Sequence, residues 1–151
     1  MSQHKIAPGY DSSIPPNAIQ GGVEKDGKPL FIARSFYQGS LHPGKAGQHI
    51  EDGGFSLGYG GKEVKLHEYY VLCGDGSKLR WVEQNGDFVI KDFTPIEAGH
   101  EADGSPLYAA KTFYKGGQQL GKCGDHLKGG IHFGCGKKER ISDTYMVLAY
   151  L

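Results

Sequence analysis

Short stretches of apolar and aromatic residues alternate with polar, glycine-containing turns along most of the chain. Leu30–Tyr37 and Leu107–Tyr114 are rich in aromatic residues, and each follows an Asp-Gly pair. Such pairs favour the positive φ angles of tight hairpin turns. Glycine also interrupts nearly every window long enough to show a helical period. The pattern therefore predicts antiparallel strands and gives little support to helices.

Two further hairpins are expected in the middle of the chain. Asp75-Gly76 separates Glu68–Cys73 from Lys78–Val82, and Asn85-Gly86 separates that second run from Asp87–Lys91. Because both dipeptides are typical of hairpin turns, we expect a meandering antiparallel sheet through this segment. The single tryptophan, which lies in Lys78–Val82, is predicted to be part of the core.

The C-terminal segment Lys137–Leu151 is long and free of glycine, and its Tyr-Met-Val-Leu-Ala-Tyr run favours a strand. Each repeat contains one aromatic pair, Phe36-Tyr37 in the first and Phe113-Tyr114 in the second. Successive side chains of a strand point to opposite faces, so one ring of each pair should face the core and the other the outside.

The sequence contains an internal repeat. A shift of 77 residues places Glu24–His49 on Glu101–His126, and a shift of 76 continues the match as far as Leu72 and Leu148. Half of the positions in the first aligned segment are identical, and they include prolines, aromatic residues and charged residues as well as glycines. Segment 74–93 has no second copy in the sequence, so we expect it to join or complete the two units.

We therefore predict an all-β fold of two tandem β-repeats, related by pseudo-two-fold symmetry and built of antiparallel meander-type sheets. The expected division is residues 1–74 for the first repeat with its N-terminal segment. Residues 75–151 would hold the linking strands and the second repeat, within a single compact unit.

Composition excludes several classes of function. The 17 Lys and Arg residues balance the 17 Asp and Glu residues, which argues against a broad basic face for nucleic acid. There is no membrane span of about 18 apolar residues and no apolar core of a signal peptide. Three cysteines, an odd number, fit a reducing compartment or unconventional secretion. We therefore expect a cytoplasmic or unconventionally secreted protein.

Two acid–lysine pairs recur in register. Glu24 and Lys45 recur as Glu101 and Lys122. A carboxylate accepts hydrogen bonds and an ammonium donates three, so together they match the vicinal hydroxyls of a sugar without a metal. A plain surface ion pair is the competing interpretation. Asp26 and Asp103 recur as well and are the alternative acids, although an aspartate before glycine also serves as a turn residue.

The second repeat alone contains a possible zinc site. Cys123, His126, His132 and Cys135 have spacings that could close around a tetrahedral ion, and the two cysteines could instead form a disulfide. Of these four residues the first repeat shares only His126, which corresponds to His49. Our main expectation is therefore that the protein binds no metal or other cofactor. No nucleophile–base pair is visible either, and we expect no enzymatic activity.

The repeats resemble the DM-nine (DM9) repeat family, which includes natterin-like proteins. The resemblance rests on the pattern Asp-Gly-x-Pro-Leu-[Phe/Tyr]-x-Ala-[Arg/Lys]-x-Phe-Tyr-x-Gly, the following Gly-Lys and His, and Tyr-x-Val-Leu. It extends over nearly the whole chain and is nearest in kind to two-repeat, mannose-specific bivalve lectins that need no calcium. The family's acid is closer to aspartate, and glutamate here is one methylene longer.

The resemblance implies a calcium-independent lectin for mannose or mannose-containing glycans on microbial surfaces, acting in innate immune recognition. By position, Glu24 with Lys45 would form one sugar site and Glu101 with Lys122 the second. A homodimer is the expected assembly. The alternative is a non-catalytic protein-interaction or structural module, in which the same pairs only stabilise the repeats.

Overall fold

The computed structural model describes residues 4–151, which form fourteen β-strands and one short 3₁₀ helix, η1 (Gly76–Lys78). The first seven strands are β1 (Lys5–Tyr10), β2 (Gln20–Val23), β3 (Pro29–Tyr37), β4 (Ser40–Ala46), β5 (Phe55–Tyr59), β6 (Lys62–Leu66) and β7 (Glu68–Cys73). The last seven are β8 (Leu79–Asn85), β9 (Glu97–His100), β10 (Pro106–Tyr114), β11 (Gly117–Cys123), β12 (Ile131–Cys135), β13 (Lys138–Ser142) and β14 (Thr144–Tyr150).

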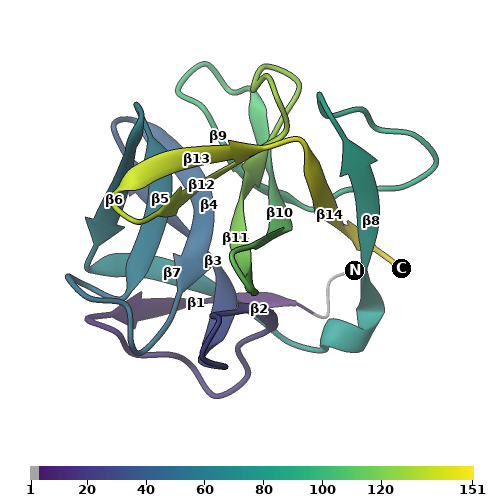
Figure 1. The fold of residues 1–151 in the computed structure, drawn as a ribbon. Helices are drawn as coiled ribbons and strands as arrows, with labels where there is room; N and C mark the ends of the chain where they lie inside the picture. Colours follow the sequence, from purple (N-terminus) through teal and green to yellow (C-terminus); the bar gives the residue numbers. More distant parts are fainter. Residues whose placement is uncertain (1–3) are drawn as a thin grey trace.

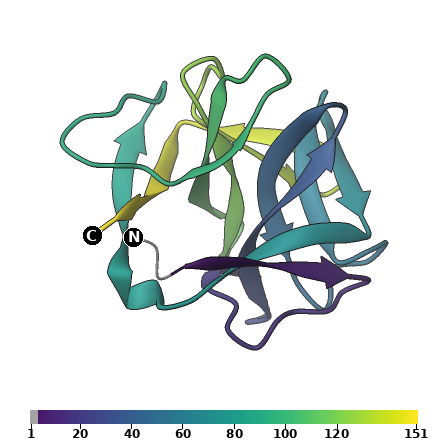
Figure 2. The ribbon, with the colours of Figure 1, turned by 180° about the vertical axis from the view of Figure 1, so that it is seen from behind.

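The two sets of seven strands repeat each other. Strands β2 to β7 recur as β9 to β14, and every pairing between strands is antiparallel. Strand β1 pairs with β7 in the first set as β8 pairs with β14 in the second, and these two pairs stand at the two ends of the strand order. In Figure 2, β8 stands at the left and β1 runs across the lower part of the molecule. The predicted all-β fold of two tandem, pseudo-symmetric repeats is confirmed.

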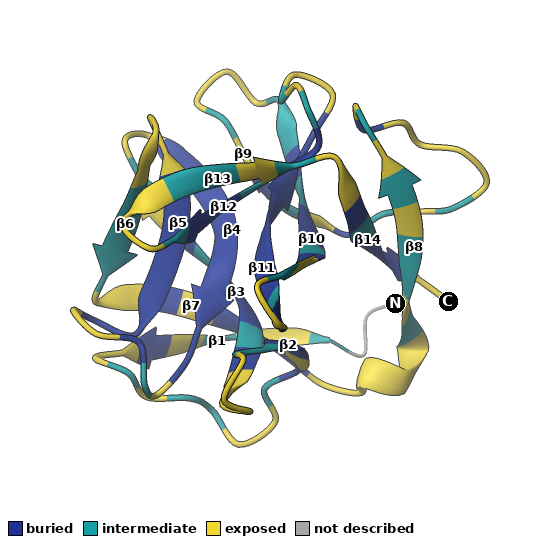
Figure 3. Ribbon diagram, viewed as in Figure 1, coloured by how far each residue is buried: buried dark blue, intermediate teal, exposed yellow. Residues whose placement is uncertain are grey.

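A closed ring of strands forms the centre of the molecule (Figure 1). Neighbouring strands run in the order β4-β5-β6-β13-β12-β11. Two further paths of paired strands connect the ends of this row, β4 and β11. One runs from β4 through β3 and β2 to β11, and the other runs from β4 through β9 and β10 to β11. Strands β4 and β11 lie at the heart of the fold, and nearly every residue of each is buried (Figure 3).

The repeats are interlocked, because one strand of each repeat pairs with a strand of the other. Strand β2 of the first repeat pairs with β11 of the second at Val23 and Gln118, and β9 of the second pairs with β4 of the first at His100 and Leu41. Glycine makes both crossings possible. A Cβ on Gly22 would lie only 2.3 Å from the carbonyl oxygen of Gln118.

The hydrophobic core has three parts. One cluster belongs to the first repeat and includes Phe55 and Tyr69, and one belongs to the second and includes Phe133 and Tyr145. The third combines residues of both repeats, such as Leu30, Ile96 and Leu148. Burial of apolar surface, at about 25 cal/mol per Å², therefore stabilises the junction between the repeats as well as each repeat.

Several local predictions are confirmed. The turns at Asp26-Gly27 and Asp103-Gly104 connect β2 to β3 and β9 to β10, and both glycines have positive φ. Phe36 and Phe113 are exposed, whereas their neighbours Tyr37 and Tyr114 pack against the core clusters. Trp81 is partly buried against the shared cluster, as expected.

The hairpins predicted in the middle of the chain are wrong. Asp75 accepts a hydrogen bond from the backbone of Ser77 and caps η1, so β7 and β8 follow each other without pairing. Asp87–Lys91 is a loop, because Gly86 hydrogen-bonds to Asp143 and β8 finds its partner in β14.

The predicted C-terminal strand Lys137–Leu151 is two strands, β13 and β14, separated at Asp143. They run in different parts of the fold: β13 pairs with β12 and β6, and β14 pairs with β8 and β10.

Candidate functional site

The Gly-Lys step places a lysine in the interior of each repeat. Lys45 lies on β4 and Lys122 on β11, with 4% and 3% of their surface exposed. The preceding glycines let the next strand approach closely, since a Cβ on Gly44 or Gly121 would lie 2.3 Å from a carbonyl oxygen of β5 or β12. The recurrence of Gly-Lys therefore has a structural cause.

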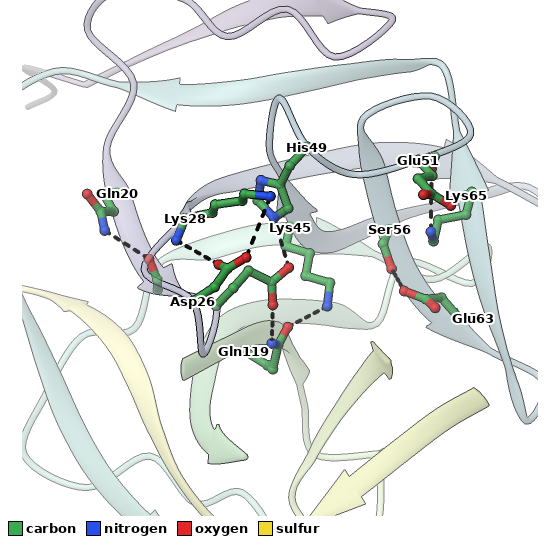
Figure 4. Close-up of polar contacts among 12 residues, drawn as sticks. Gln20, Asp26, Lys28, Lys45, His49, Glu51, Ser56, Glu63, Lys65 and Gln119 are labelled. Carbon is green, nitrogen blue, oxygen red and sulfur yellow. Dashed lines mark hydrogen bonds and ion pairs between the residues drawn. The ribbon is translucent and has the colours of Figure 1, made fainter. Parts of the chain in front are cut away.

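In the first repeat, Glu24 and Lys45 are joined through a residue of the second repeat. The Gln119 amide accepts a hydrogen bond from Lys45 Nζ (Figure 4). It donates another to Glu24 Oε1 at 2.8 Å. The other carboxylate oxygen of Glu24 lies 2.9 Å from His49 Nε2. The side chains of Glu24 and His49 retain 26% and 20% of their exposure, so the solvent reaches the acid but hardly the lysine.

The strand exchange explains why Gln119 occupies this place. Glu24 directly follows β2, and β2 pairs with β11 at Gln118. The residue after Gln118 is thereby brought beside the acid.

Burial and hydrogen bonding set the charges of this network. Burial by itself would raise the pKa of Glu24, but the hydrogen bonds from Gln119 and His49 and the charge of Lys45 outweigh it. The pKa of Glu24 is therefore below its usual value, and the acid is ionised at neutral pH. Burial lowers the pKa of Lys45.

The second repeat has the corresponding acid and lysine in two separate hydrogen-bonded pairs. His126 Nε2 lies 2.7 Å from Glu101 Oε2, and Lys122 Nζ lies 2.9 Å from Nδ1 of His42, which comes from the first repeat. Position 42 corresponds to position 119 under the shift of 77, so each lysine is contacted from the other repeat.

Gln119 contacts both the lysine and the acid of the first site, whereas His42 contacts only the lysine of the second. Burial and the charge of Lys122 lower the pKa of His42 to about 4, so its imidazole is neutral and Nδ1 accepts a hydrogen bond from the lysine. The proton then lies on Nε2, which is one of two buried side-chain polar atoms in residues 4–151 without a hydrogen-bond partner. Burial lowers the pKa of Lys122 to about 8, against the attraction of Glu139 and Glu101.

Asp26 and Asp103 have a different place in the structure. Each accepts a hydrogen bond from the backbone two residues on, at 3.1 Å from Lys28 and 2.9 Å from Ser105. These are turn contacts at the surface. Of the predicted acids, Glu24 is connected to a buried lysine through Gln119, and Glu101 contacts His126.

The proposed zinc ligands do not come together. Cys123 is buried in the core of the second repeat, and the two histidines pair with acids, His126 with Glu101 and His132 with Glu139. Within residues 4–151 no group of three or more His, Cys, Asp or Glu side chains is arranged to hold a metal, and all three cysteines are free. The structure therefore neither gathers the four residues around one point nor joins Cys123 to Cys135.

A hollow opens beside the network of the first repeat. Its volume is about 410 Å³, and it is lined by Ile14, Lys28, Pro29, Phe31, Gln48 and His49. His49 belongs to both, since its ring contacts Glu24 and lines the hollow. The acid therefore stands at the edge of a space that a small molecule could occupy.

Comparisons with known proteins agree with the repeat structure. The family model of the DM9 repeat matches residues 1–53 and 49–142. The chain belongs to the DM9 repeat family. Membership indicates a carbohydrate-binding or interaction module of a non-catalytic kind.

A solved structure shows the same fold. This DM9 protein is similar to the nematode sperm cell motility protein MFP2B, with a TM-score of 0.69 and 15% sequence identity. The similarity covers 99% of this chain and 47% of that one, so the chain spans about half the length of MFP2B. Among curated proteins, no sequence matches.

A search for membrane-spanning helices in residues 4–151 finds none of sufficient length and apolar character.

Proposed function

We propose that this DM9 protein is a calcium-independent lectin that binds mannose or mannose-containing glycans on microbial surfaces. One site is formed by Glu24 with Lys45, and the second by Glu101 with Lys122. The observation that carries the proposal recurs in both repeats: a partly exposed acid contacts a histidine, and a buried lysine is contacted by a residue of the other repeat.

The chemistry of the first network suits a polyol. Each oxygen of Glu24 already accepts one hydrogen bond and has capacity for another, from a sugar hydroxyl. Lys45 has three donors, of which Gln119 takes one. The low pKa of Glu24 keeps it ionised, and hydrogen bonds to a charged acceptor are the stronger kind.

Binding and site assignment are tested together. A glycan array with and without chelator should show terminal mannose binding in both conditions. By calorimetry, Lys45→Ala or Glu24→Gln should weaken one site by about 1–3 kcal/mol, because a partner group is left without its hydrogen bonds. Lys78→Ala, which removes an exposed lysine of η1, is the matched control. Unchanged affinity in the double variant Lys45→Ala/Lys122→Ala would refute the assignment.

Recognition of cells should depend on valency. A shallow site binds a monosaccharide weakly, with a Kd on the order of 0.1–1 mM. Two sites per chain, and four in the homodimer we propose, could raise avidity by about 10²–10⁴. Lys122→Ala should therefore reduce agglutination of mannose-coated beads far more than affinity at the remaining site. A verified monomer with one site that agglutinates as well as the intact protein would contradict this.

The burial of both lysines favours a second candidate, a non-catalytic interaction or structural module. In that case the networks fasten the repeats together. Absence of binding to every sugar of the array, combined with a loss of stability in Lys45→Ala, would support the interaction module over the lectin.

A further inference from the structure

The two repeats differ at the position of the hollow beside Glu24. Phe31 in its wall corresponds to Tyr108 under the shift of 77. The ring of Phe88 lies 4.9 Å from the ring of Tyr108, and Phe88 is only 4% exposed. A core side chain therefore packs against the tyrosine that corresponds to Phe31.

The connecting loops account for the difference. Residues 86–96 join β8 to β9, whereas the shorter segment 11–19 joins β1 to β2 in the first repeat. The longer loop brings Phe88 into the core of the second repeat. In the first repeat the loop contributes Ile14 to the wall of the hollow and leaves the space beside it open.

The lining of the hollow is amphipathic. Pro29, Phe31 and Ile14 supply apolar surface, and Lys28, Gln48 and His49 supply polar groups. A pyranose has the same division, with apolar C–H faces and hydroxyls at its rim. The volume of about 410 Å³ is within the range of small-molecule sites, about 300–1,000 Å³.

We infer that this hollow is a subsite for the second sugar unit of an oligosaccharide whose terminal mannose is bound at Glu24. The inference rests on the proposed lectin function. It makes the two sites of the chain unequal: the first repeat binds two linked sugar units, with the second one against Phe31. The second repeat binds the terminal unit alone, because Phe88 occupies the equivalent place.

The experiment uses two single-site proteins. Glu101→Gln leaves the site of the first repeat, and Glu24→Gln leaves that of the second. Each is titrated with methyl α-mannoside and with α-linked mannobioses of the different linkages. In the Glu101→Gln protein, at least one mannobiose should bind about fivefold more tightly than the monosaccharide, a factor equal to about 1 kcal/mol. In the Glu24→Gln protein the two affinities should be equal.

Variants of the wall then locate the gain. Added to the Glu101→Gln protein, Phe31→Ala should abolish the preference for mannobiose and leave monosaccharide affinity unchanged. Gln48→Trp, at an exposed position, should fill the hollow with the same result even if Phe31→Ala folds poorly. Phe113→Ala, which removes an exposed ring elsewhere, is the control and should keep the preference.

The outcomes separate this inference from the function beneath it. Three outcomes would overturn the subsite while mannose binding stands. They are an equal preference for mannobiose in both single-site proteins, a preference that survives Phe31→Ala and Gln48→Trp, and no preference in either protein. Absence of binding to any of these sugars would overturn the lectin assignment, and the subsite with it.

Discussion

The buried imidazole of His42 should make the protein sensitive to mild acid, and its replacement by glutamine should remove that sensitivity. The ring is fully buried, between Lys122 and the ring of Tyr59, which lies 5.3 Å away. A second positive charge at this place would lie against the lysine. His42→Gln is a conservative change in this fold, because glutamine is the residue that the other repeat has at the equivalent position 119.

The magnitude follows from the pKa of His42 in the two states. It is about 4 in the folded protein and about 6.5 in the unfolded chain. Between these values the unfolded chain binds a proton that the folded protein does not, so stability falls as the pH falls through this window. The full loss is about 3 kcal/mol, of which about 2 kcal/mol is reached at pH 5 and almost none at pH 7.

Urea denaturation at pH 7 and pH 5 provides the test. The acids of the networks have lowered pKa values and lose stability mainly below pH 4.5, in both proteins alike. The wild type should therefore lose about 2 kcal/mol more than His42→Gln between the two pH values. Equal losses, with equal m-values, would refute the reasoning, because they would mean that His42 is protonated in the folded state or not buried there.

Three further predictions concern the lysine networks. Gly121→Ala should lower the free energy of unfolding by about 1–3 kcal/mol, because its Cβ would meet the His132 carbonyl oxygen at 2.3 Å. Gly76→Ala, whose nearest atom is 3.5 Å away, should change stability by less than about 0.5 kcal/mol in the same denaturation experiment. From pH 7 to pH 9 the free energy of unfolding of the wild type should rise by about 1 kcal/mol relative to that of Lys122→Met. The reason is that Lys122 loses its proton near pH 8 in the folded state and near pH 10.5 in the unfolded one. A fall in this difference would contradict the burial of Lys122 as a charged group. Sugar binding measured after exhaustive chelation should equal that of untreated protein, and its loss would show that a metal takes part.

The repeat was legible in the sequence because identities such as Pro29, Phe36 and Gly44 recur at fixed distances. These residues have local tasks, at a strand start, on a surface and at a close approach of strands, and local tasks preserve residue type. The equivalence of β1 in the first repeat and β8 in the second left no such signal in the sequence. An outer strand needs only backbone pairing and a few apolar side chains, and unrelated sequences satisfy this requirement.

The residues that contact each lysine from the other repeat were missed for a related reason. A search for identical residues finds Glu24 and Lys45 but passes over Gln119 and His42, which are aligned and different. Their importance comes from the strand exchange, and β2 is paired to β11 by a contact between distant parts of the chain. The glycines at these crossings, Gly22 and Gly99, were the available signal, since only a residue without a side chain permits such an approach.

The placement of Gln119 and His42 has a consequence for how such a protein could arise. A single repeat cannot complete its own network, so two copies associating as a symmetric pair of separate chains would be the simplest form with whole sites. In that form the same residue necessarily contacts the lysine in both sites, because one gene encodes both chains. Duplication and fusion into one chain lift this restriction, and a change on one side no longer alters the other. Glutamine beside one lysine and histidine beside the other is a difference that a homodimer encoded by one gene would not have.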